Sequence, residues 1–502
     1  MTEELRSLAS LWGMQTSYHD VSGALRTASA DALVAVLAAL GAPIARPDDA
    51  REALRARRLE LWRRAVEPVI VACEGEPFAF EVRLPESAPD RRVAWRLRTE
   101  DGGERHGEVV LGVVPAAGAE VEGERYGVFR VGVPERPPLG YHALDVEIGG
   151  RTRTVRVLAS SRWIGPGDVG SAAWGLFLPL YALATHRGWG AGDLTDLEEF
   201  LVWAGGRGAR LVGTLPLLAS FLDEPYDPSP YAPASRLAWN EFYVDPARAP
   251  EWPRCEFARA IHSSGRFQEE LSALRRSDHV DYRRLMALKR QVLEALAVEH
   301  WSSDSEAFRD RRRFEESRPV VDDYARFRAA VERRRVSWHA WPGAMADGRI
   351  PEGEFDEHAR RYHVYVQWLC HQQLARLAEA RSAGAAELYL DLPLGVHPDG
   401  YDVWRERSSF VPGVSVGAPP DPLAPAGQDW GFPPLSPQGL RETGYRYLTQ
   451  TLRHHLEHSR ALRIDHAAGF HRVYWVPRGL GATEGVYVDY PAEELYAVHS
   501  IE

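Results

Sequence analysis

The sequence has little cysteine, with three residues in a chain of 502: Cys73, Cys255 and Cys370. They lie far apart and form no Cys-x-x-Cys pair, which excludes a disulfide framework, a zinc ribbon and a thioredoxin-type motif. A chain of this length buries enough apolar surface to fold without disulfide bonds. The cysteine content therefore indicates a reducing compartment.

The sequence also lacks excess positive charge and any long apolar run. Its formal net charge is −11, and an acidic chain without a basic stripe is a poor partner for nucleic acid. The first residues, MTEEL, carry acids where a signal peptide needs bases. The most apolar stretch, residues 31–43, is about half the length of a membrane span. We expect a cytoplasmic protein with neither nucleic acid nor a membrane as partner.

A common phosphate-binding motif is absent as well. The glycine-rich segment 188–193 has the wrong spacing for a phosphate-binding loop, and no Gly-Lys-Ser/Thr follows it. We therefore exclude a nucleotide site there.

Tryptophan, by contrast, is abundant, with 16 residues. Tryptophan packs protein cores, and the flat apolar faces of sugar rings also stack on aromatic rings. The composition alone leaves both roles open.

The residue pattern divides the chain into three parts. Residues 1–62 are predicted to be helical, with Ser29 at the N-cap and Gly41 at the C-cap of an apolar helix. Residues 63–161 contain short alternating runs split by Asp-Gly and Gly-Gly turns, which predicts a β-sandwich accessory domain. Residues 162–502 form the third part.

The third part is predicted to be a catalytic domain of the α/β class. Continuous apolar runs separated by helices indicate parallel strands that are buried on both faces. In a (β/α)8 TIM barrel the active site lies where such strands end. A strongly helical stretch at about 250–380 is expected to be an insertion in that domain. The four apolar runs are residues 174–183, 209–220, 387–394 and 461–470.

Polar side chains that a scaffold does not need are concentrated in four segments of this part. They are Tyr231 in 226–245, Asp391 in 390–404, Asp421, Gln428 and Trp430 in 416–435, and Arg463, Asp465 and His466 in 462–475.

Asp465 is the sharpest candidate for chemistry. It follows an apolar strand, and Arg463, two residues earlier, shares its face. A nearby guanidinium keeps a carboxylate ionised at neutral pH, as a nucleophile requires. A structural ion pair at a strand end explains the same pattern, and the residues alone leave both open.

Three late histidines, His454, His455 and His458, raise the question of a metal site. The last two are spaced i, i+3 on a predicted helix, but no companion carboxylate is evident. We expect a surface-facing helix side and no metal.

Four segments together resemble the amylomaltases, the 4-α-glucanotransferases of glycoside hydrolase family 77. The helical start and the β-sandwich are similar to those of the long bacterial form of that family. The segments are WGLFLPLYALATHRGWGAGDLTDLEEF, SPYAPASRLAWNEFYVD, APPDPLAPAGQDWGFPP and RIDHAAGF.

The resemblance implies an enzyme that transfers α-1,4-glucan segments between maltodextrins by a retaining double displacement, with no metal or organic cofactor. It implies that Asp465 is the nucleophile and that Arg463 and His466 steady the Asp465 carboxylate and hydrogen-bond the sugar. It further implies that maltooligosaccharides contact a second set of residues, which are Tyr231, Asp391, Asp421, Gln428 and Trp430. Of these, Gln428 and Asp421 are implied to belong to a mobile loop that helps exclude water.

The chain departs from the family in its last residues. The family's acid/base glutamate lies in a Glu-Asp-Leu-Gly segment after the next strand, and a further aspartate lies further on in a His-Asp pair, but neither segment occurs after Asp465 in this sequence. The late glutamates Glu484 and Glu502 are poor substitutes, because one lies in a glycine-rich loop and the other is terminal. We therefore expect only the first part of the barrel, a chain inactive alone, and a C-terminal segment as the partner that completes the barrel.

Two alternative functions stay open at this point. The first is a non-catalytic α-glucan-binding protein, which the missing acid/base glutamate favours. The second is a hydrolase with an α-amylase-like barrel, which the SPY and GQDWG segments disfavour.

Overall fold

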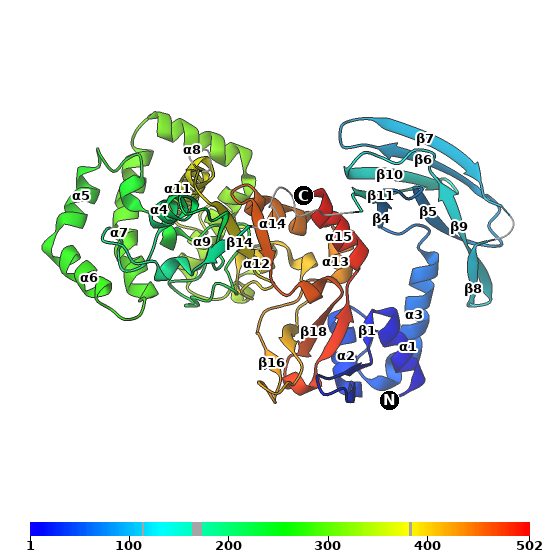
Figure 1. Cartoon of the computed structure of the whole chain (residues 1–502). Helices are drawn as coiled ribbons and strands as arrows, with labels where there is room; N and C mark the ends of the chain where they lie inside the picture. The colour runs from blue at the N-terminus through cyan, green and yellow to red at the C-terminus, as the bar shows by residue number, and fades with distance from the viewer. Residues whose placement is uncertain (113–114, 163–172, 381–383) are drawn as a thin grey trace. The chain divides into compact units, whose positions relative to one another are not determined.

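A computed structural model describes residues 1–112, 115–162, 173–380 and 384–502 (Figure 1). The chain forms two compact units, which we describe separately. The first unit comprises residues 1–166, 408–452 and 467–502, and the second comprises 167–407 and 453–466.

The first unit begins with three helices, α1 (Glu3–Leu11), α2 (Ala30–Ala39) and α3 (Ala50–Arg63). The Ser29 side chain accepts a hydrogen bond from the backbone N–H of Ala32, so the predicted N-cap of α2 is confirmed. The helical prediction for this part misses three short strands, β1 (Met14–Gln15), β2 (Ser17–His19) and β3 (Leu25–Thr27).

Two antiparallel sheets follow in the first unit. One has the order β4-β11-β10-β6-β7, in which only β4 and β11 are parallel, and the other has the order β5-β9-β8. Alternate residues of these strands, such as Val93 and Leu97 of β6, are fully buried, as in a half-buried strand. The strands are β4 (Val69–Cys73), β5 (Ala79–Pro85), β6 (Arg92–Arg98), β7 (Glu104–Val110), β8 (Ala117–Val121), β9 (Glu124–Gly132), β10 (Gly140–Ile148) and β11 (Arg151–Ser160).

A third sheet of the first unit joins residues from both ends of the sequence. Its order is β1-β19-β18-β15-β16, and Met14 of β1 is paired with Val488 of β19. The other elements of this region are β15 (Val414–Ala418), β16 (Gln428–Asp429), α13 (Pro437–Glu442), β18 (Arg472–Pro477), β19 (Val486–Asp489) and α15 (Ala492–Ile501), and α14 spans Arg446–Leu456.

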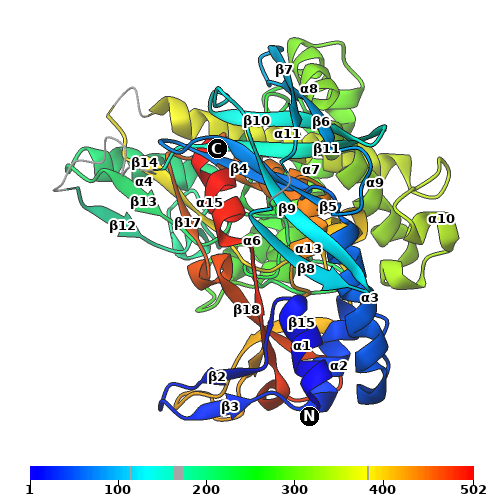
Figure 2. The ribbon, with the colours of Figure 1, turned by 90° about the vertical axis from the view of Figure 1, so that its right-hand side faces the viewer.

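The second unit is built on four parallel strands in the order β12-β13-β14-β17 (Figure 2). They lie within the four apolar runs, so the predicted parallel strands are confirmed. They are β12 (Gly175–Phe177), β13 (Leu211–Gly213), β14 (Glu387–Leu392) and β17 (Ala461–Ile464). In the described residues this sheet is open and closes no barrel.

The first two strands are shorter than their apolar runs predict. Pro179 and Pro216 follow soon after β12 and β13, and proline lacks the N–H that a strand needs to continue its ladder. The rest of both runs is therefore loop or 3-10 helix.

Helices cover the sheet of the second unit. Leu197 and Leu201 of α4, and Leu369 and Leu374 of α11, share one buried core with Val212 of β13. The helices are α4 (Leu194–Gly205), α5 (Glu256–Ser263), α6 (Gly265–Arg275), α7 (Tyr282–Trp301), α8 (Glu306–Ser317), α9 (Pro319–Arg334), α10 (Gly343–Ala346), α11 (Glu357–Ala380) and α12 (Tyr401–Arg405). None of the described helices combines the length and the apolarity needed to cross a membrane.

The glycine-rich segment 188–193 is fixed by charge rather than by a ligand. Arg187 donates to the carboxylates of Asp193 at 2.6 Å and Asp245 at 2.8 Å, and Asp193 also caps α4. Such a buried charge network immobilises the loop. This geometry accounts for the segment without a phosphate.

Candidate active site

The neighbouring strands β14 and β17 bring together three of the predicted site residues, Asp391, Arg463 and Asp465. The strands run parallel, with Asp391 in register with Arg463. The backbone N–H of Asp465 donates to the carbonyl of Leu392 at 3.0 Å, which extends this pairing by one bond beyond β17. The carboxyl ends of parallel strands meet at one edge of a sheet, so these side chains converge there.

Arg463 links two carboxylates at this edge. Its Nη1 donates to Asp391 Oδ1 at 2.6 Å and its Nη2 donates to Asp465 Oδ1 at 2.7 Å. The hydroxyl of Tyr231 donates to the other Asp391 oxygen at 3.0 Å. The structure thus joins four of the predicted site residues in one hydrogen-bonded chain.

The two carboxylates differ in access to solvent. The side chain of Asp391 is 1% exposed, whereas that of Asp465 is 27% exposed. A nucleophile has to reach its substrate, which the more exposed Asp465 can do. The buried Asp391 holds Arg463 and Tyr231 in place.

Burial and charge shift the pKa values of this chain of groups. Burial raises the pKa of Asp391, against the opposing effect of its hydrogen bond from Arg463. Burial and the neighbouring Asp391 carboxylate raise the pKa of Tyr231 to about 12. Burial would lower the pKa of Arg463, but its hydrogen bonds to Asp391 and Asp465 raise it. At neutral pH the guanidinium and the phenol therefore keep their protons.

His466 turns the chain directly after Asp465. Its φ of +52° lies in the left-handed region, which is uncommon for any residue other than glycine. Burial lowers the pKa of the imidazole, although the Asp465 carboxylate acts in the opposite direction. A strained backbone at this position is a feature that functional sites often retain.

The loop that carries Tyr231 is anchored by Asp402 of α12. Asp402 is fully buried and accepts hydrogen bonds from Ser235 Oγ at 2.6 Å and from the Arg236 backbone N–H at 2.8 Å. The Arg236 guanidinium also donates to the carbonyl of Pro393 at 3.2 Å, just after β14. The loop and the end of β14 are therefore positioned together.

Replacing Asp402 with Ala is expected to destabilise the protein by about 2 kcal/mol, because hydrogen bonds to a buried charged group are lost and their donors are left unpaired. Urea unfolding measures this change. Asp356→Ala is the matched control, because Asp356 is an exposed aspartate that accepts from the backbone at the start of α11. An equal loss in both variants would contradict the anchoring role of Asp402.

The remaining predicted residues, Asp421, Gln428 and Trp430, belong to the first unit. The indole N–H of Trp430 donates to Gln428 Oε1 at 3.0 Å, and the Trp430 side chain is 36% exposed. Asp421 accepts from the backbone N–H of Ala424 at 2.6 Å and so shapes a tight turn. The structure thus hydrogen-bonds Trp430 to Gln428. We infer no contact between the residues of this loop and Arg463 or its two carboxylate partners.

The prediction of a surface-facing side for the late histidines is wrong. His455 and His458 are buried, and the His454 ring stacks on Trp239 with centroids 4.2 Å apart. The i, i+3 spacing gave no sign of this burial, because the partners come from distant segments. His458 Nε2 lies 2.9 Å from His371 Nδ1 of α11, at hydrogen-bond distance.

A carboxylate that the sequence did not single out accompanies these histidines. The ligand atoms of His371, Glu457 and His458 lie within 4.8 Å of one another, so within the described part of the chain this group could hold a metal ion. Glu457 also pairs with Arg318, and the two imidazoles hydrogen-bond each other. These contacts account for the cluster without a metal.

The buried histidines predict acid sensitivity. Burial, neighbouring imidazoles and Arg318 lower the pKa values of His371 and His454, and burial and Arg318 lower that of His458 to about 4. The unfolded chain therefore binds more protons below the ordinary histidine pKa of about 6.5. Stability that is present at pH 7 is lost as the pH falls toward 4.

Between pH 7 and pH 5 we expect the free energy of unfolding to fall by about 2 kcal/mol for each such histidine. Urea unfolding at the two pH values measures this loss. In His458→Gln the loss should be smaller, since glutamine can keep a hydrogen bond to His371 but takes up no proton. The same loss in both proteins would show that His458 does not contribute.

Comparison with known proteins confirms the resemblance. A family model described as 4-alpha-glucanotransferase matches residues 178–502, and one described as the MalQ N-terminal beta sandwich domain matches residues 65–159. The 4-alpha-glucanotransferase of Mycobacterium tuberculosis is 33% identical over 526 aligned positions, which cover 100% of this chain and 71% of the relative.

Comparison with solved structures leads to the same family. The amylomaltase from Corynebacterium glutamicum superimposes with a TM-score of 0.83 at 28% identity, covering 99% of this chain and 70% of that one. The amylomaltase from Streptococcus agalactiae in complex with acarbose shares the fold with a TM-score of 0.54 at 22% identity, over 65% and 66% of the two chains. The chain thus belongs to the 4-alpha-glucanotransferase family, glycoside hydrolase family 77.

Proposed function

We propose that this chain carries the nucleophile for transfer of α-1,4-glucan segments between maltodextrins, with a covalent intermediate on Asp465. The chain alone is inactive on maltodextrins, because it has no Glu-Asp-Leu-Gly segment to supply the acid/base glutamate. The observation that carries the proposal is the accessible Asp465 carboxylate, held by Arg463 at the end of a parallel strand. Membership of a 4-alpha-glucanotransferase family supports the reaction class.

The reaction proceeds in two displacements. In the first, an Asp465 oxygen attacks the anomeric carbon, the bond to the leaving glucan oxygen breaks, and a glycosyl ester forms. In the second, the hydroxyl of an acceptor glucan attacks the same carbon and the ester bond breaks. Two inversions give overall retention. A second carboxyl protonates the leaving oxygen and later deprotonates the acceptor, and we assign this role to no residue of the chain.

Arg463 and its partners prepare the nucleophile. The guanidinium donates a hydrogen bond to Asp465 and fixes the direction of its carboxylate. Asp391 holds the guanidinium, Tyr231 donates to Asp391, and both Asp391 and Tyr231 belong to the sugar site. The strained turn at His466 presents its imidazole beside the nucleophile, where it donates to a sugar hydroxyl.

The exposed indole of Trp430 provides a flat surface for a sugar ring. Gln428, bonded to that indole, and Asp421, at the turn of the same segment, belong to a loop that limits the access of water. Exclusion of water favours transfer over hydrolysis.

We further propose that the open sheet of the second unit is the first part of a (β/α)8 barrel with its helical insertion, behind a helical segment (1–62) and a β-sandwich (63–161). The exposed Trp174, just before β12, and Phe177, the last residue of β12, support this, because further strands would cover their apolar surface. Three free cysteines suit a reducing cytoplasm.

The test uses α-maltotriosyl fluoride as donor and a labelled maltose as acceptor. Fluoride leaves without protonation, so the first displacement depends on the nucleophile rather than on the acid. We expect fluoride release together with labelled maltodextrins longer than maltose. Fluoride release with free maltotriose alone would indicate a hydrolase. Donor binding without fluoride release would indicate a glucan-binding protein.

A further inference from the structure

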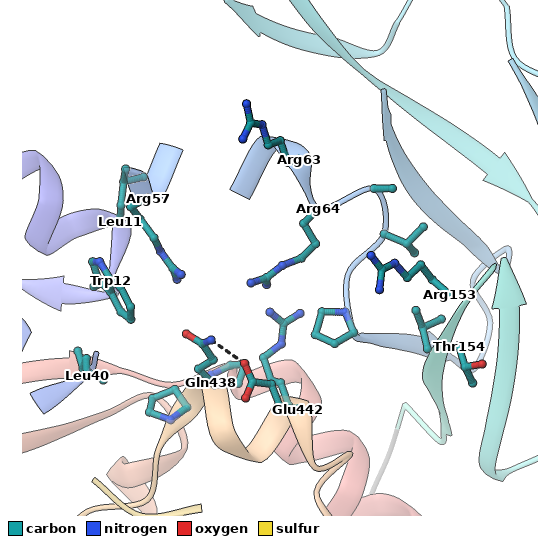
Figure 3. A pocket seen from close by; sticks show the side chains of 18 of the residues that line it. Leu11, Trp12, Leu40, Arg57, Arg63, Arg64, Arg153, Thr154, Gln438 and Glu442 are labelled. Carbon is teal, nitrogen blue, oxygen red and sulfur yellow. Dashed lines mark hydrogen bonds between the residues drawn. The ribbon is translucent and has the colours of Figure 1, made fainter. Parts of the chain in front are cut away.

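A cavity of about 640 Å³ within the first unit gathers arginines from three separate segments. Its size is that of a site for a small molecule. Figure 3 shows the side chains around it. The arginines are Arg57 and Arg63 of α3, Arg64 at the C-cap of α3, Arg151 and Arg153 of β11, and Arg441 of α13.

The charge of this cavity contrasts with that of the whole protein. Six arginines line it with only two carboxylates, Glu442 and Asp489, although the chain carries a net charge of −11. Arg63, Arg151 and Arg153 make no ion pair within the described residues. The remaining three arginines share Glu60, Glu67 and Glu494. The excess positive charge of the cavity is therefore carried by Arg63, Arg151 and Arg153.

Two buried donors in the cavity wall lack a partner. The Arg57 guanidinium lies over the Trp12 ring at 4.0 Å, and neither Arg57 Nε nor Trp12 Nε1 makes a hydrogen bond. The Arg57 side chain is only 10% exposed. Buried N–H groups without partners are costly, and an oxygen-bearing ligand removes that cost.

The arrangement of the arginines also calls for an anion. Figure 3 shows the side chains of Arg57 and Arg64 pointing toward each other across the cavity, with Arg153 on its opposite wall. Glu60 already pairs with both Arg57 and Arg64, at 2.8 Å and 2.9 Å, whereas Arg153 makes no ion pair within the described residues, so an added anion is attracted to the side of the cavity that Arg153 lines. A phosphate group presents several oxygens to such donors and suits arginine in particular.

We propose that this cavity binds a sugar monophosphate. The phosphate accepts hydrogen bonds from Arg57, Arg64 and Arg153, and the sugar ring lies against the apolar wall of Leu11, Trp12 and Leu40. This site is independent of the chemistry at Asp465, and its ligand is neither donor nor acceptor in the proposed transfer.

Calorimetric titration of the full chain with glucose 6-phosphate tests the proposal, with glucose and inorganic phosphate as comparison ligands. We expect glucose 6-phosphate to bind with a Kd below about 1 mM, more tightly than inorganic phosphate, and glucose not to bind. Arg64→Gln and Arg153→Ala should each weaken binding about tenfold. Raising the ionic strength should weaken it as well.

The control is Arg130→Ala, an exposed arginine of β9 outside the cavity lining, which should bind like the unaltered chain. Arg153 is exposed, so its variant decides the outcome if Arg64→Gln does not fold. Asp465→Asn should also bind normally, which separates this site from the proposed active site. No binding, or unchanged binding in both cavity variants, would overturn the proposal. Equal binding of inorganic phosphate would overturn the assignment of a sugar.

Discussion

Asp465→Asn is expected to lower the rate of fluoride release from α-maltotriosyl fluoride by at least about 1,000-fold, because the nucleophile is lost. The amide is nearly isosteric with the carboxylate and can still face Arg463, but it cannot form a glycosyl ester. Because Asp465 is 27% exposed, the change should leave the fold intact. Fluoride release measured with an ion-selective electrode tests the loss of rate, and a thermal melt of the variant tests whether the fold is intact.

The matched control for this variant is Asp278→Asn. Asp278 is an exposed aspartate in the same unit, so the chemical change is identical but lies outside the hydrogen-bonded chain of Asp391, Arg463 and Asp465. It should release fluoride at the rate of the unaltered chain. Similar losses in the two variants would mean that Asp465 is not the nucleophile.

Arg463→Ala is expected to impair both stability and chemistry. Its removal leaves the buried Asp391 carboxylate without its cation, a change that costs about 3–5 kcal/mol for fully buried pairs. Since the Arg463 side chain is 40% exposed, water offsets part of the loss, and we expect about 2 kcal/mol. Fluoride release should slow about 100-fold, because Asp465 loses both its orientation and its partner charge.

The stability loss in Arg463→Ala depends on pH in a defined direction. Burial already raises the pKa of Asp391, and without the guanidinium it rises further. A carboxyl with a raised pKa in the folded state stabilises the fold at low pH and loses that contribution as the pH rises through the folded-state value. The variant should therefore lose less stability at pH 5 than at pH 7.5.

Urea unfolding of the variant at pH 5 and pH 7.5 measures this difference. Arg463→Lys is the conservative control, because an ammonium keeps the charge but cannot hold two carboxylates as a guanidinium fork does. The free energy of unfolding of Arg463→Lys should lie between that of Arg463→Ala and that of the unaltered chain. A loss that is independent of pH would show that Arg463 contributes packing rather than charge.

The candidate catalytic residues at the strand ends can be predicted from the sequence because they lie close together along the chain. Arg463 and Asp465 are two residues apart at the end of an apolar run, and this alternation places them on one face of β17. The polar segments also single out Asp391 and Tyr231, and the resemblance implies their contact with sugar. In the structure Asp391 accepts from Arg463, and Tyr231 donates to Asp391.

Features made by distant segments are not accessible in this way. The pairing of β1 with β19 joins Met14 to Val488 across most of the sequence, and neither short strand has a periodic signal of its own. The histidines at the end of α14 and just after it have the spacing of a solvated helix side, and only the contacts with His371 and Trp239 show that they are buried. The spacing of apolar residues along a helix or strand predicts which of its residues are buried. It does not predict which distant segments bury them.

The most direct test of Asp465 as nucleophile is to trap the intermediate. The chain is incubated with a maltosyl fluoride that carries a second fluorine on its ring, which slows breakdown of the ester, and is then digested with trypsin. The tryptic peptide 464–472, IDHAAGFHR, contains Asp465 as its only side-chain carboxyl. We predict that mass spectrometry finds the fluorinated maltosyl group on this peptide, and not in Asp465→Asn. A maltosyl label on a different peptide, or the same label in Asp465→Asn, would contradict the assignment.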